Sequence, residues 1–130
     1  MAPRSLALVL GLCNVVAGAL LVSAPSLVLG TLEGSHTPSA RLLGGCIGVL
    51  LAAIGVGALG TPPEAIRSYL WIFGVAVKVV AALLWSLTAL QTGAGGLLFG
   101  AAADGALALA IAGGLWRPRA AGTRDGPTTQ

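Results

Sequence analysis

Apolar residues dominate four long runs of the chain, and short stretches rich in Pro, Gly, Ser and charged residues separate them. An α-helix of about 20 residues measures about 30 Å, the thickness of the hydrocarbon core of a bilayer. The pattern predicts an all-α fold, an integral membrane four-helix bundle within residues 1–116, followed by a disordered cytoplasmic tail, 117–130. The predicted spans are about 6–22, 41–59, 69–90 and 97–116.

The third run is the most informative, because Lys78 is its one ionisable interior residue and lies near its centre. On a helical wheel, the side of Lys78 carries small and aromatic residues, whereas the opposite side is apolar throughout. An ammonium group at mid-membrane is costly unless the protein supplies a partner. The residues that share the side of Lys78 are Trp71, Gly74, Ala81, Ala82 and Trp85.

Two other runs each carry a polar residue at a comparable depth. Counted from one membrane face, Asn14 and Lys78 lie about 14 Å deep and Asp104 about 18 Å deep, at 1.5 Å per residue. Helices joined by a short loop are usually antiparallel neighbours. We therefore predict a buried ion pair between Lys78 and Asp104, with Asn14 supplying a further hydrogen bond. Such a trio either fixes the helix register or carries protons or binds a polar ligand, and the single acid and base favour the structural role.

Small residues recur along the second run at Gly44, Gly48, Ala52 and Gly55. A small-xxx-small stripe lets another helix approach closely, so it predicts a helix-packing seam. Arg41 stands at the mouth of this seam. Its long side chain can reach lipid headgroups, or it can receive an anionic group in an anion contact.

Turn signals and the cysteines add local predictions. Thr37 and Pro38 suit the N-cap and first position of the second helix. The stretch from Thr61 to Glu64 has the spacing of a capping box that would open the third helix. Cys13 and Cys46 lie in separate apolar runs without the spacing of metal ligands, so we expect them to be small buried hydrophobic residues.

Composition and charge restrict the class of protein. Hydrophobic residues make up 56% of the chain and charged residues 8%, against about 25% charged residues in soluble domains. The net charge of +3 comes from arginines that flank the apolar runs, and no nucleic-acid-binding motif is present. Because Arg41 alone falls on one side, the positive-inside rule predicts a multi-pass protein of the cell (inner) membrane with both termini in the cytoplasm. The residues on the cytoplasmic side are Arg4, Arg67, Arg117, Arg119 and Arg124.

The layout resembles small bacterial four-helix membrane proteins of unknown function and, more broadly, DoxX-like membrane proteins. The shared features are Asn14, Pro25, Arg41 with Gly44 and Gly45, Lys78, and Asp104. The resemblance covers nearly all of the chain except the tail. Because some DoxX-like proteins are associated with quinone-linked oxidoreductases, it implies a redox association, although the sequence contains no redox motif.

Three classes of function can be compared. The leading hypothesis is a structural or accessory membrane subunit without catalytic activity, assembled with itself or with a membrane partner protein through the glycine seam. The alternative is a small transporter or proton-coupled carrier that uses the Lys–Asp pair. An enzyme is the weakest hypothesis, because the sequence has no nucleophile–base constellation, metal cluster, P-loop or dinucleotide fingerprint. We accordingly expect no cofactor and no metal, with the lipid bilayer as the main partner.

Overall fold

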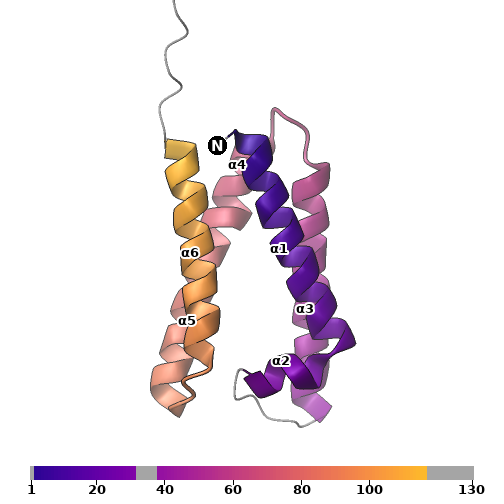
Figure 1. The fold of residues 1–130 in the computed structure, drawn as a ribbon, viewed down its shortest axis with the longest axis vertical. Helices are drawn as coiled ribbons and strands as arrows, with labels where there is room; N and C mark the ends of the chain where they lie inside the picture. Colours follow the sequence, from indigo (N-terminus) through magenta and orange to yellow (C-terminus); the bar gives the residue numbers. More distant parts are fainter. Residues whose placement is uncertain (1, 32–37, 117–130) are drawn as a thin grey trace, which may run out of the picture.

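The structure is a computed structural model that describes residues 2–31 and 38–116 (Figure 1). This part of the chain is all-α and has no strand. Helices α4, η1 and α5 follow one another without a break and form one long helix, so four helices are long and apolar enough to cross a membrane. The elements are α1 (Pro3–Ser23), α2 (Pro25–Thr31), α3 (Pro38–Gly60), α4 (Ile66–Tyr69), the π-helix η1 (Leu70–Ala76), α5 (Val77–Thr92) and α6 (Leu97–Trp116).

The long helices form two hairpins. Helix α1 packs along α3, and the helix made of α4, η1 and α5 packs along α6. Figure 1 shows the hairpins meeting at the end that holds the N-terminus and separating toward the end that holds α2. Helix α5 packs mainly on α6 and η1 and has no extensive contact with α1 or α3. The described helices therefore differ from the predicted bundle, because all four pack together only at one end.

We call the end at which the hairpins meet the closed end and the end that holds α2 the open end. The hydrophobic core lies at the closed end and joins the two hairpins. Small residues allow the close approach, since a Cβ at Gly114 would lie 2.8 Å from Leu6 Cδ1. The core residues are Leu6, Ala7, Leu10, Ala58, Ile66, Leu70, Ile111 and Leu115.

The first hairpin is held by the predicted seam. A Cβ added at Gly55 would lie 2.7 Å from the carbonyl oxygen of Gly11, and one at Gly48 would lie 2.8 Å from that of Gly18. At such distances the helix backbones touch, which only glycine permits. The seam is thus a packing surface, as predicted, but α1 of the same chain occupies it. It is not open to a partner protein in this fold, contrary to the assembly route expected from the sequence.

The π-helix in the third span was not predicted. Buried residues recur there every four positions, at Ile66, Leu70, Gly74 and Lys78. In a regular α-helix a step of four residues overshoots a full turn by about 40°, so three steps would rotate the last residue by about 120°. The wider turns of η1, in which Val77 N donates to Ile72 O, offset this drift. Lys78 therefore stays on the inner side.

The closed end is also tied by hydrogen bonds to backbone carbonyls. Arg4 Nη1 donates to Thr61 O over 3.0 Å, and Arg67 Nη2 donates to Leu115 O over 3.1 Å. Tyr69 Oη donates to Ile54 O over 2.6 Å. Since the last carbonyls of a helix lack partners within it, the two arginines supply both hydrogen bonds and favourable charge there.

Two local predictions are wrong. Thr61 does not open the third helix, because its hydroxyl donates back to Gly57 O at the end of α3, and the helix starts at Ile66 without a side-chain cap. Cys13 and Cys46 are exposed on the lateral surface, since the buried positions of α1 and α3 are taken by the seam. Pro38 begins α3 as predicted, whereas Thr37 and the tail lie outside the described residues.

Candidate functional site

Lys78 and Asp104 are joined inside the second hairpin, as the sequence predicted. Lys78 Nζ donates to Asp104 Oδ1 over 2.7 Å. The two side chains are only 9% and 18% exposed. This short contact is a charge-assisted hydrogen bond, the stronger class of hydrogen bond in proteins. The pair thus neutralises the single interior base of α5 with the single interior acid of α6.

Close contacts on either side of the pair set the register of the two helices. Toward the open end, Trp85 covers Gly100, where a Cβ would lie 3.3 Å from the indole ring. Toward the closed end, a Cβ at Gly74 would lie 2.8 Å from Ile111 Cδ1. Each helix therefore contributes one bulky side chain that packs on a glycine of the other helix. This complementarity holds Lys78 level with Asp104.

Asn14 does not complete the predicted trio. Its side chain is 2% exposed, but its amide nitrogen has no hydrogen-bond partner among the described residues. Leu10 approaches Gly74, where a Cβ would lie 3.4 Å from Leu10 Cδ2. Asn14 and Lys78 each follow about one helical turn later, yet Lys78 Nζ donates to Asp104 and no hydrogen bond joins it to Asn14. The predicted hydrogen bond from Asn14 to the pair is therefore wrong, and a buried donor is left unpaired.

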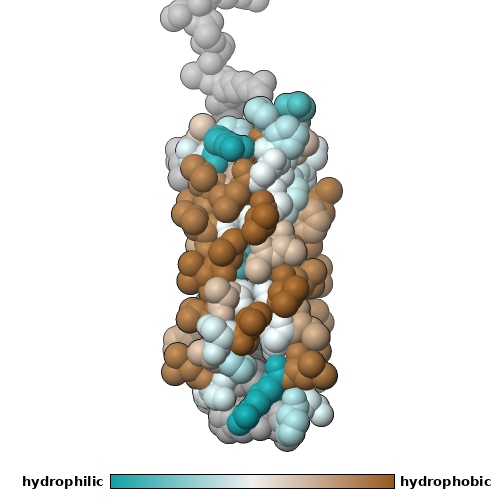
Figure 2. Space-filling view, turned by 90° about the vertical axis from the view of Figure 1, so that its right-hand side faces the viewer, coloured by the Kyte–Doolittle hydropathy of each residue, from teal (hydrophilic) through white to brown (hydrophobic). Residues whose placement is uncertain are grey.

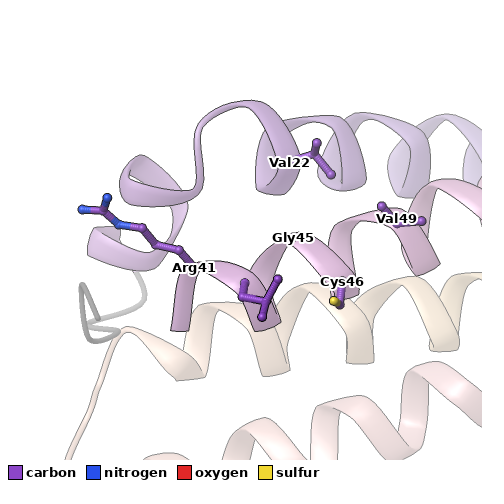
Figure 3. A pocket seen from close by; sticks show the side chains of 6 residues that line it. Val22, Arg41, Gly45, Cys46 and Val49 are labelled. Carbon is purple, nitrogen blue, oxygen red and sulfur yellow. The ribbon is translucent and has the colours of Figure 1, made fainter. Parts of the chain in front are cut away.

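Arg41 lies far from this cluster. It is exposed in the first turn of α3, at the end of the fold that holds α2. It belongs to a lateral groove shown in Figure 3. The seam residues Gly44, Gly48 and Gly55 are buried, and Gly48 and Gly55 lie directly against α1. The residues singled out in the sequence thus occupy separate places: the ion pair, the buried position of Asn14, the packing seam and the groove.

The chemistry that this site can perform follows from its few groups. One base and one acid form a closed pair, and the described residues contain no group of three His, Cys, Asp or Glu side chains that could hold a metal ion. Proton transfer would require the pair to open. The feature that sequence reasoning missed is η1, which ends two residues before Lys78 and belongs to a helix type often found at functional sites. Its clearest sequence trace is the four-residue spacing of inward-facing residues.

The surface has the distribution of polarity expected at a membrane. Figure 2 shows hydrophobic residues across the middle of one face and hydrophilic groups toward both ends. Large apolar side chains are more than half exposed on each long helix, and a water-exposed protein rarely presents such extended apolar patches. Examples are Leu12 and Val16 on α1, Val49 and Leu50 on α3, Leu83 and Leu84 on α5, and Phe99 and Leu109 on α6.

No protein-family model, curated protein or solved structure matches the chain. The resemblance to DoxX-like proteins therefore stays a prediction.

Proposed function

We propose that this chain is a multi-pass integral protein of the cell membrane, with both termini in the cytoplasm, that acts as a non-catalytic structural or accessory subunit. The observation that carries the proposal is the closed Lys78–Asp104 pair in an otherwise apolar helical hairpin. A single pair with no further ion-pair partner among the described residues suits a device that fixes register. Breaking it would leave an uncompensated charge in a low-dielectric interior.

The exposed apolar sides of the helices support membrane insertion, and the arginines support its direction. Arg4 and Arg67 bind backbone carbonyls at the closed end, where α1 begins and α6 ends (Figure 1). Under the positive-inside rule this side is cytoplasmic. The redox association implied by the DoxX-like resemblance names one class of membrane partner, a quinone-linked oxidoreductase.

Membrane insertion and direction are tested by reporter fusions. Alkaline phosphatase, which is active outside the cytoplasm, is fused after Gln130 and, in a second variant, inserted after Gly93, in the α5–α6 turn. We expect activity only from the fusion at Gly93, with a cytoplasmic fluorescent reporter giving the reverse pattern. Activity after Gln130 would overturn the proposed direction, and recovery of the unfused protein in the alkaline-washed soluble fraction would overturn insertion.

The subunit role is tested by affinity purification from mild detergent followed by native gel electrophoresis. We expect the wild-type chain to migrate in a complex of fixed stoichiometry. The Lys78→Ala and Asp104→Ala variants should lose this complex, because their second hairpin loses its register. A wild-type chain that migrates only as a monomer would contradict the subunit role.

A second candidate function is a small proton-coupled carrier, which the unpaired amide of Asn14 favours. A buried polar group without a partner suits a site that a ligand or water completes. The test is substrate-independent proton flux in proteoliposomes under an imposed pH gradient. Flux abolished by Asp104→Asn and Asn14→Leu, but kept by the exposed-site control Ser23→Ala, would favour the carrier over the subunit.

A further inference from the structure

The first hairpin carries a lateral groove near α2, and the proposed function does not use it. Its volume is about 490 Å³, within the range of roughly 300–1,000 Å³ of pockets that hold small ligands. Its wall on α3 runs from Leu42 to Val49, about 10 Å along the helix axis at 1.5 Å per residue. The lining residues are Val22 of α1 and Arg41, Leu42, Gly45, Cys46 and Val49 of α3.

The groove is chemically asymmetric along its length. Figure 3 shows Val22, Cys46 and Val49 around the apolar part, while the side chain of Arg41 extends away from them to the end of α3. Arg41 forms no ion pair with a described residue, and the described acids, Glu64 and Asp104, lie elsewhere. The groove therefore joins a cation that has no ion-pair partner in residues 2–31 and 38–116 to an apolar channel, which is the pattern complementary to an anionic amphiphile.

The position of Arg41 makes an anion the fitting partner. Arg41 lies in the first turn of α3, which contains no acidic residue. The N-terminal end of a helix carries a partial positive charge, so a guanidinium there adds like charge unless an anion is bound. In a membrane, this first turn would lie at the boundary between the lipid headgroups and the hydrocarbon core, because the apolar span begins at Leu42.

We propose that this groove binds one anionic phospholipid, with the phosphate on the Arg41 guanidinium and an acyl chain along Leu42, Cys46 and Val49. The proposal rests on the membrane insertion proposed above. Gly45 gives the groove its depth, since a Cβ there would meet nothing within 4 Å. The groove can therefore be filled by substitution without disturbing the seam, in which the nearby Gly48 lies against Gly18.

A second lateral groove serves as an internal control. It lies on α1, is lined by Leu12, Cys13, Val16, Ala17 and Leu20, and contains no charged residue. Each groove holds one exposed free cysteine, Cys46 or Cys13. The native chain thus carries a reporter thiol in the proposed site and another in an uncharged groove.

The first experiment measures lipid binding to the purified chain in detergent by native mass spectrometry, with phosphatidylglycerol and phosphatidylcholine of equal chain length. We expect one bound phosphatidylglycerol in preference to phosphatidylcholine. Arg41→Gln should reduce this preference about tenfold, the effect of losing a charge-assisted hydrogen bond. Gly45→Leu should reduce binding of both lipids, whereas Gly113→Leu, at another glycine with open space, should leave binding unchanged. Equal binding of both lipids to the wild-type chain would overturn the proposal.

The second experiment needs no variant and distinguishes a lipid from a free anion. The chain is placed in vesicles of phosphatidylcholine with or without one-fifth phosphatidylglycerol, and the alkylation rates of Cys46 and Cys13 by a membrane-permeant maleimide are compared. We expect phosphatidylglycerol to slow Cys46 several-fold relative to Cys13. Equal slowing of both thiols, or protection of Cys46 by inorganic phosphate alone, would overturn the lipid site. Failure here with correct topology of the reporter fusions would leave the proposed function standing.

Discussion

Gly18 of α1 and Gly48 of α3 face each other so closely that neither can accept a side chain. A Cβ at Gly48 would lie 2.8 Å from Gly18 O, and a Cβ at Gly18 would collide with Gly48 O. Helices that lack a hydrophobic driving force in lipid gain their association from such backbone contact. The first hairpin therefore depends on these glycines, whereas the second depends on an ion pair flanked by bulky side chains.

The glycine contact predicts opposite effects for two neighbouring substitutions in α3. Gly48→Ala should lower the free energy of unfolding by about 1–3 kcal/mol, because the new methyl group overpacks the seam. Gly45→Ala should raise it by about 0.5–1 kcal/mol, because the site has open space and alanine favours the helix. The measurement is unfolding in detergent titrated with sodium dodecyl sulfate. Equal shifts in the two variants would contradict the packing of the seam.

The ion pair predicts strong coupling between Lys78 and Asp104. Lys78→Ala or Asp104→Ala should each lower the free energy of unfolding by about 3–5 kcal/mol, because one charge remains buried without a partner. The double variant should lose much less than the sum. The same detergent unfolding assay measures the cycle. Additive single effects would show that the two side chains do not interact in the folded chain.

The unpaired amide predicts that Asn14 can be replaced by an apolar residue of similar size. Asn14→Leu should leave the fold intact and raise the free energy of unfolding by about 1 kcal/mol, because a buried donor without a partner carries an uncompensated desolvation penalty. Asn14→Ala is the control for volume alone and should gain less. A large loss of stability in Asn14→Leu would indicate that the amide binds something essential, in favour of the carrier.

The arginine at the closed end predicts a local effect on α6. Arg67→Ala removes the hydrogen bond to Leu115 O and a positive charge from the end of the helix, which should cost about 0.5–1.5 kcal/mol. Hydrogen exchange of the amides in the last turn of α6 should become faster. Arg67→Lys, which keeps the charge, should show a smaller increase. Unchanged exchange in Arg67→Ala would mean that the end of α6 does not need this contact.

The sequence by itself determined the helices and the charge pairing. The lengths of the apolar runs predict the four long helices because backbone hydrogen bonding within a helix is local and depends on nearby residues. The structure extends the third of them from 69–90 to 66–92 and keeps the fourth at 97–116. The pairing of Lys78 with Asp104 could be predicted because the apolar runs contain one basic and one acidic interior residue, and these lie at similar depths.

Only the tertiary structure decided how the helices share their surfaces. The glycine seam faces α1 and not a partner protein, the buried amide nitrogen of Asn14 has no partner among the described residues, and Cys46 lines a groove instead of a core. These outcomes depend on contacts between residues far apart in the chain, and a single helical wheel does not specify which neighbour fills each side. The π-helix also depends on tertiary contacts. Its wider turns keep Leu70, Gly74 and Lys78 on the inner side, where they pack against other helices.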